Sequence, residues 1–179
     1  MIRRSRGHGT MAHEEGLDVR DGIGAEAERA RRFEAHLSIL LVNVDGLGVV
    51  NAKLGKKAGD FVLDEIAQLI RRQTRSIDVV GRWDREDFIV LSVDKNAFGS
   101  VVMAEKLRRI IADHLFDWEG RQVRVTVSIG VSRGVPSDES QIDSLIDAAR
   151  NAVLRAKTAG RNRIEYAGSD GELSLQTNP

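Results

Sequence analysis

The run LSILLVNV, residues Leu37–Val44, sets the architecture of this chain. Apolar residues fill it almost continuously, and several of them are β-branched. A short apolar run of this kind is typical of a strand that is buried on both faces of a sheet. The sequence therefore predicts a central strand here, and the segments around it have to supply the layers that cover both faces.

Helix and strand patterns alternate on either side of this run. Upstream, strong helix formers over Gly24–Glu34 predict an exposed helix. Downstream, the patterns predict an amphipathic helix over Ala58–Thr74, a hairpin of strands Val79–Trp83 and Phe88–Val93, a helix marked by Met103–Leu115, a strand over Val123–Val131, a helix marked by Ile142–Ala156 and a closing strand over Arg163–Tyr166. The order helix, strand, two helices, hairpin, helix, strand, helix, strand predicts an α/β (α+β) sandwich, with one mixed central sheet covered by helices.

We expect one domain over residues 23–167, between flexible tails over residues 1–22 and 168–179. The first tail mixes glycine, histidine, serine and charged residues without periodicity, and the second is polar. The arginines near the N-terminus are not followed by an apolar segment, so we do not interpret this region as a signal peptide.

Composition excludes several classes of function. Acidic and basic side chains balance at 27 each and aromatic residues are only 4% of the chain, so we do not expect a nucleic-acid binder. The absence of cysteine excludes disulfides and thiolate metal sites and fits a cytoplasmic protein. No apolar run approaches the roughly 20 residues that a membrane helix needs, so we expect no membrane insertion.

Four segments carry a resemblance to a known family. They are VNVDGLGVVNAKLGKKAGD (Val42–Asp60), RSIDVVGRWDREDF (Arg75–Phe88), VTVSIGVS (Val125–Ser132) and AKTAGRNRI (Ala156–Ile164). In this order and at these separations they resemble the GGDEF domain of the diguanylate cyclase family, over about Glu28–Tyr166. The resemblance implies a nucleotidyl cyclase-like fold. It also implies an ancestry of enzymes that condense two GTP molecules into cyclic di-GMP with the help of two divalent metal ions.

The catalytic positions that the resemblance assigns are altered in this chain. The first metal-binding aspartate of the family falls on Asn43, and its phosphate-reaching lysine falls on Gly48. A neutral amide is a much weaker ligand for magnesium than a carboxylate. We therefore expect no metal site and no requirement for a cofactor.

The signature turn is altered as well. Its two glycines fall on Asp84 and Arg85, where glycine would serve positive φ and close approach to the nucleotide. Glu86 stands at the acidic metal-binding position, and Asp87 replaces the usual glutamate with a shorter arm. We interpret these changes together as a degenerate active site, and we expect no enzyme activity.

Some positions of the substrate site are retained. Asn51 and Asp60 match the family's guanine-binding pair, and Lys157 and Arg161 match its phosphate-binding pair. The alternative is structural, because an acid near a helix start and cations near a helix end are favoured by the helix dipole in any protein. Asp45 is also retained, but a single carboxylate does not make a two-metal site.

A second motif suggests a function. Arg75 and Asp78 form the only Arg-x-x-Asp of the chain, six residues before Asp84, where many family members have an inhibitory site for cyclic di-GMP. Arginine can fork onto a guanine edge or a phosphate, and aspartate can accept from guanine N1 and N2. Arg108, on the following helix, is the candidate for the arginine that completes such a site. The alternative is a solvated surface pair that caps the preceding helix.

The leading hypothesis is a catalytically inactive GGDEF-type domain that acts as a cyclic di-GMP receptor and relays the signal to an unidentified effector protein. A ligand-linked homodimer is a weaker expectation, because an intercalated ligand dimer can bridge two such surfaces. The alternatives are a scaffold that binds proteins without nucleotide and an active diguanylate cyclase.

Overall fold

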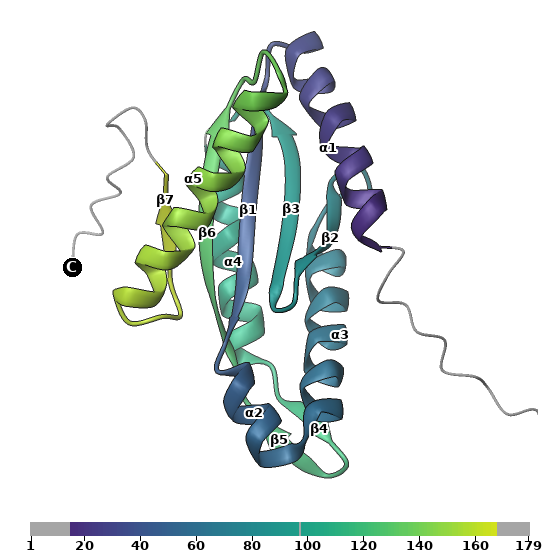
Figure 1. The fold of residues 1–179 in the computed structure, drawn as a ribbon, viewed down its shortest axis with the longest axis vertical. Helices are drawn as coiled ribbons and strands as arrows, with labels where there is room; N and C mark the ends of the chain where they lie inside the picture. Colours follow the sequence, from purple (N-terminus) through teal and green to yellow (C-terminus); the bar gives the residue numbers. More distant parts are fainter. Residues whose placement is uncertain (1–14, 97, 168–179) are drawn as a thin grey trace, which may run out of the picture.

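The computed structural model describes residues 15–96 and 98–167, in which a five-stranded sheet lies between helices (Figure 1). The helices are α1 (Glu15–Arg32), α2 (Leu47–Leu54), α3 (Lys56–Gln73), α4 (Gly99–Asp113) and α5 (Glu139–Thr158). The strands are β1 (His36–Asp45), β2 (Val79–Asp84), β3 (Asp87–Asp94), β4 (Phe116–Trp118), β5 (Arg121–Val123), β6 (Thr126–Gly134) and β7 (Ile164–Tyr166). The tail expected over 168–179, and residues 1–14 of the tail expected over 1–22, lie outside the described residues. No helix in the described part is long and apolar enough to cross a membrane.

The sheet has the strand order β2-β3-β1-β6-β7. Strand β1 lies at its centre and pairs antiparallel with both β3 and β6, whereas β6 and β7 are parallel. The sheet is therefore mixed, and the predicted fold class is confirmed. Strands β4 and β5 form a separate two-stranded hairpin.

Alternation along β1 sends its side chains into two separate cores. Leu37, Ile39 and Leu41 belong to the core that α1 and α5 cover. Leu40 and Val42 belong to the core that α2, α3 and α4 cover. The polar residues at the two ends of β1 follow the same alternation. Those at odd-numbered positions face α1 and α5, and those at even-numbered positions face α2, α3 and α4.

Gly130 in β6 lets α5 lie close to the sheet. A Cβ at this position would collide with the backbone carbonyl of Ala149. The missing side chain thus fixes the distance between α5 and the strand next to β1, and with it the position of the loop that follows α5.

The structure differs from the sequence prediction in three places. Helix α1 begins at Glu15, well before Gly24, and it is not wholly exposed, because one stripe of it is buried against the sheet: Val19, Ile23, Ala27 and Ala30. The strand expected over Val123–Val131 runs three residues later, over Thr126–Gly134. The β4–β5 hairpin before it was not predicted, because three-residue strands are too short to show a periodic pattern.

Candidate functional site

The altered catalytic positions gather at the end of β1, on the face that α5 covers. Asn43 and Asp45 continue the alternating row of Leu37, Ile39 and Leu41, which packs under α1 and α5. Both polar side chains are buried, with exposed fractions of 7% and 6%. Their hydrogen bonds therefore decide what this end of the sheet can bind.

Asn43 is bound to Asp87. The two residues face each other in the β1–β3 register, and Asn43 Nδ2 donates to Asp87 Oδ1 over 2.6 Å. The other atom of the amide, Asn43 Oδ1, is buried and has no hydrogen-bond partner among the described residues. The family resemblance assigns a metal-binding carboxylate to the position of Asn43. The amide found here instead donates a hydrogen bond to Asp87 and occupies one of its oxygens.

Asp45 is held by three donors. Its Oδ1 accepts from Ser128 Oγ over 2.8 Å, and its Oδ2 accepts from Thr126 Oγ1 over 2.8 Å and from the Asn162 backbone N–H over 3.2 Å. Both oxygens are used to join β1 to β6 and to the loop before β7. These partners were not predicted from the sequence, although the polar residues that alternate through the start of β6 were a readable signal.

The turn between β2 and β3 closes without glycine. Asp84 pairs with Asp87 across a two-residue turn of Arg85 and Glu86, and none of these residues has a positive φ. The turn is held by its own side chains: Asp84 Oδ1 accepts from Arg85 N over 2.7 Å, and Arg82 donates to the Arg85 carbonyl over 2.6 Å. Asp84 and Arg85 are exposed, so both charged side chains stand on the surface of the turn.

The same turn is attached to the end of β1. Val44 N donates to the Glu86 carbonyl over 3.1 Å. Consecutive residues of β1 therefore anchor two different loops, because Asp45 binds the loop at Asn162 on the other side. The hairpin turn and the loop after α5 flank the same strand end.

The loop after α5 carries the two retained cations. Lys157 lies in the last turn of α5, and Arg161 follows Gly160 with a φ of 62°. Asn162 is also left-handed, with a φ of 46°. Left-handed backbone at a non-glycine residue is strained and persists where surrounding contacts hold it. Here Asp45 holds the Asn162 backbone, and an arginine of α4 holds its side chain.

The retained guanine-site positions lie on α2 and α3. Asn51 packs over Gly59, where a Cβ would collide with Asn51 Oδ1, and that oxygen is buried without a hydrogen-bond partner among the described residues. Asp60, which follows Gly59 in α3, is exposed. Gly48 is exposed near the start of α2, with open space where a side chain would lie.

The Arg-x-x-Asp motif lies after the end of α3. Asp78 Oδ2 accepts from the Arg75 backbone N–H over 2.8 Å, and Asp78 N donates to the Arg75 carbonyl over 3.1 Å. The aspartate therefore caps the backbone of its own motif, while its second oxygen, Oδ1, is buried without a hydrogen-bond partner among the described residues. The Arg75 side chain is 61% exposed, and its guanidinium lies 3.8 Å from Oδ2 of Asp94 at the end of β3.

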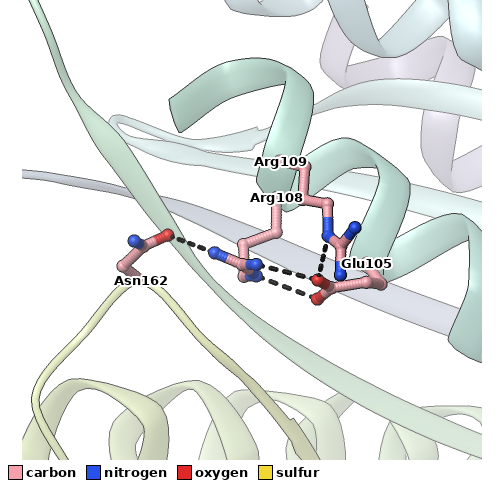
Figure 2. Close-up of polar contacts among 4 residues, drawn as sticks. All are labelled: Glu105, Arg108, Arg109 and Asn162. Atoms are coloured by element: carbon pink, nitrogen blue, oxygen red, sulfur yellow. Dashed lines mark hydrogen bonds and ion pairs between the residues drawn. The ribbon is translucent and has the colours of Figure 1, made fainter. Parts of the chain in front are cut away.

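Arg108 is placed away from this motif. Figure 2 shows its guanidinium between Glu105, which accepts two hydrogen bonds from it, and the side chain of Asn162, which accepts one over 2.9 Å. The hydrogen bond from Arg108, with further help from Arg109, lowers the pKa of Glu105 to about 2. Gly99, at the start of α4, packs against Asp94, and Arg108 lies nine residues further, about 13 Å along the helix axis.

Within the described residues, no group of three or more histidine, cysteine, aspartate or glutamate side chains is placed to hold a metal ion. At the end of β1 the oxygens of Asp45 already accept three hydrogen bonds, and Asp87 accepts one from Asn43. A pair of divalent ions needs several free anionic oxygens, and these hydrogen bonds occupy three of the four carboxylate oxygens of Asp45 and Asp87.

Comparisons with known proteins agree with one another. A family model described as the GGDEF domain of diguanylate cyclases matches residues 19–163. Diguanylate cyclase A of Treponema denticola is 34% identical over 128 residues, which are 72% of this chain and 34% of that protein. This chain therefore spans about a third of the length of that relative.

Two solved structures extend the comparison. The GGDEF domain of DgcB from Caulobacter crescentus, in complex with c-di-GMP, has a TM-score of 0.80 at 19% identity, and the match covers 93% of this chain and 99% of that one. Diguanylate cyclase SiaD from Pseudomonas aeruginosa, in complex with its activator SiaC, has a TM-score of 0.78 at 25% identity, and the match covers 84% of this chain and 57% of that one. The first of these likenesses concerns the fold alone.

Proposed function

This chain belongs to the family of GGDEF domains of diguanylate cyclases, and we propose that it binds cyclic di-GMP at Arg75 and Asp78 and does not synthesise it. In this proposal the bound ligand is the signal, and an effector protein of unidentified nature reads it. The domain of residues 23–167 works in the cytoplasm and requires no metal or cofactor. The family is one of enzymes, so the proposal separates this chain from its named relatives.

The hydrogen bond from Asn43 to Asp87 is the main support for the proposal that the chain does not synthesise cyclic di-GMP. Synthesis by two metal ions needs anionic oxygens that are free to coordinate them. Here one of the altered positions is neutral, and it occupies an oxygen of the other. Asp45 and Asp87 keep their carboxylates at this end of the sheet, but hydrogen bonds already occupy both oxygens of Asp45 and one oxygen of Asp87.

The turn between β2 and β3 also supports the proposed lack of catalytic activity. An active site of this kind needs backbone that a nucleotide can approach closely. Asp84 and Arg85 put two charged side chains at that place, and the carboxylate of Asp84 would repel phosphates. Because the turn is held by its own side chains, it does not need a ligand to become ordered.

The proposed binding of cyclic di-GMP rests on the hydrogen-bonding groups of Arg75 and Asp78. Asp78 has one carboxylate oxygen occupied by the Arg75 backbone and a second without a partner among the described residues. This second oxygen is buried, so a guanine N1 or N2 donor reaches it only when the segment Arg75–Asp78 moves, and the new hydrogen bond would then offset the cost of the unmatched acceptor. Arg75 is largely exposed and makes only a 3.8 Å contact with Asp94, so its fork is available to a phosphate or a guanine edge.

The remaining predicted residues take secondary parts. Arg108 joins the site only by giving up contacts with Glu105 and Asn162, or from a second copy in a ligand-linked homodimer. Asn51, Asp60, Lys157 and Arg161 are the contacts that a residual, weak binding of GTP would use. Nothing in the proposal requires that binding.

A titration calorimetry experiment with cyclic di-GMP tests the receptor. Wild-type protein is expected to bind and Arg75→Ala to lose binding while it keeps its circular dichroism spectrum. Arg121→Ala is the matched control, because Arg121 is an exposed arginine on the β4–β5 hairpin. Equal binding by the wild type and Arg75→Ala would place the ligand elsewhere.

The named activities of the relatives favour a second candidate, a diguanylate cyclase. Incubation of the protein with GTP and magnesium, followed by chromatography, separates the two. The proposal predicts no cyclic di-GMP above the background of a protein-free sample. If the wild-type protein makes several molecules of cyclic di-GMP per protein molecule and Asp87→Ala makes none, the chain is an enzyme.

A further inference from the structure

The face of the sheet under α3 and α4 changes from apolar to polar toward the start of β1. Along β1 the row that begins with Val42 and Leu40 continues through Ser38 to His36. His36 lies opposite Asp94 of β3, and Ser38 lies opposite Arg133 of β6. The same end of the face therefore has charged residues on both sides of β1.

Arg133 belongs to this face because it continues a buried row of β6. Val127, Ile129 and Val131 pack into the core under α3 and α4, and the alternation brings Arg133 next in line. It is half-buried, and its Nε is buried without a hydrogen-bond partner among the described residues. A desolvated guanidinium with an unmatched donor is costly, so this position needs an acceptor.

Asp94 is the acid whose negative charge acts on Arg133. Burial lowers the pKa of Arg133, and the negative charge of Asp94 opposes that shift. Burial and the positive charge of Arg133 together lower the pKa of His36. Asp94 also lies 3.8 Å from Arg75, so the same carboxylate acts on two arginines.

Asp94 is itself fixed in place. Its Oδ1 accepts from the Asn96 backbone N–H over 2.9 Å, and its Oδ2 lies against Gly99 at the start of α4. A Cβ at Gly99 would meet that oxygen, so the glycine makes room for the carboxylate. Asp94 thus lies close to Arg75 and acts electrostatically on Arg133, and the strand register places their strands β3 and β6 on either side of β1.

We propose that Arg133 is the second arginine of the cyclic di-GMP site, on the other side of Asp94 from Arg75. This inference rests on the proposed receptor function. A cyclic dinucleotide carries two phosphodiesters and two guanine edges, and each accepts from a guanidinium. Arg75 binds one acceptor from the exposed side, and Arg133 binds another from the partly desolvated side.

The contrast with Arg108 is what selects Arg133. Arg108 donates to Glu105 and to Asn162, so binding a ligand would break existing hydrogen bonds. Arg133 is half-buried, its Nε is buried without an acceptor among the described residues, and a ligand that reaches this group breaks no hydrogen bond at Nε. The sequence pattern favoured an arginine on the helix after the hairpin, but the strand register brings one from β6.

Calorimetric titration of four variants tests the assignment. Arg133→Met keeps the apolar stem and removes the charge, and it is expected to weaken cyclic di-GMP binding at least tenfold, equivalent to about 1.4 kcal/mol. Arg133→Lys keeps the charge without the fork and is expected to fall between Arg133→Met and the wild type. Arg75→Ala reports on the site itself, and Arg121→Met is the surface control.

The outcomes are distinguishable. Loss of binding in Arg133→Met with an unchanged melting temperature supports the assignment, and intermediate binding by Arg133→Lys supports it even where Arg133→Met folds poorly. Wild-type affinity in both Arg133 variants, with loss in Arg75→Ala, overturns Arg133 and leaves the receptor standing. Absence of binding by wild-type protein overturns the receptor function and this inference with it.

Discussion

Asn43 and Asp87 face each other across β1 and β3 and share a hydrogen bond of 2.6 Å from Nδ2 to Oδ1. The family resemblance assigns a metal-binding aspartate to the position of Asn43 and a glutamate to the position of Asp87. Two carboxylates in register at this distance would repel each other unless a cation or a proton lay between them. The amide of Asn43 avoids this repulsion, because it donates a hydrogen bond to Asp87.

Replacement of Asn43 by aspartate tests this relationship. Asn43→Asp loses the hydrogen bond and places a second carboxylate against Asp87, so the free energy of unfolding at pH 7 should fall by about 1–3 kcal/mol. The loss should shrink as the pH falls and one carboxyl becomes protonated. Urea denaturation at pH 7 and at pH 5 measures both, with Asn151→Asp, an exposed change on α5, as control. Unchanged stability at pH 7 would contradict the account of this pair.

Asp45 should act as a structural acceptor. Asp45→Asn replaces an oxygen with an amide donor that faces the donors of Thr126, Ser128 or Asn162. We expect a loss of about 2 kcal/mol in the free energy of unfolding, because buried donors are left without acceptors. Chemical denaturation of Asp45→Asn beside Asp60→Asn, an exposed acid on α3, measures the difference. Equal stability of the two variants would be inconsistent with the three hydrogen bonds.

Much of the architecture was predictable, because burial imposes a period on the sequence. The apolar run Leu37–Val44 became the central strand His36–Asp45, and the hairpin Val79–Trp83 with Phe88–Val93 lies within β2 and β3. Helix α1 was predicted too short. Its buried stripe has only two large apolar residues, Val19 and Ile23, and is completed by Ala27, Ala30 and Gly22, which lies against Val79, so the apolar signal is weak.

The contacts of the site were less predictable than its positions. A motif places Asp45, but its hydrogen bonds depend on the register between β1 and β6, which joins residues far apart in the chain. Arg108 was assigned from its position on α4, whereas its direction depends on the rotation of that helix toward Asn162. Tertiary pairing of this kind leaves no local pattern to read.

The ion pair of Glu105 should give an acid-dependent stability. Its pKa is lowered from 4.5 to about 2, first by the hydrogen bond from Arg108. A lowered pKa in the folded state adds stability above the unfolded value, and this stability is lost as the pH falls from about 4.5 toward 2. Glu105→Gln should therefore lose about 1 kcal/mol or less at pH 7, since the pair is partly exposed, and should equal the wild type near pH 2.

Denaturation curves across this acid range check the prediction for Glu105. Asp147→Asn, which breaks the exposed pair of Asp147 with Arg150, is the control and should change little. A constant difference between Glu105→Gln and the wild type at every pH would contradict the role of the ion pair.

Glu26 should show the opposite dependence. It is 7% exposed on α1, and burial, with a further contribution from Asp78, raises its pKa while Arg29 opposes the shift. A raised pKa means that stability is highest below the unfolded value and is lost as the pH rises through the folded value. Glu26→Gln should then have a higher melting temperature than the wild type at pH 7, and the gain should disappear below about pH 4.5. Glu28→Gln, exposed on the same helix, should show no such gain.

We propose that this domain binds cyclic di-GMP at Arg75 and Asp78. Isothermal titration of wild-type protein with cyclic di-GMP, beside Arg75→Ala under the same conditions, measures this binding. We expect saturable heat with a dissociation constant of tens of micromolar or tighter for the wild type, and none for Arg75→Ala. If the wild-type protein gives no heat over that concentration range, the domain is not a receptor for cyclic di-GMP.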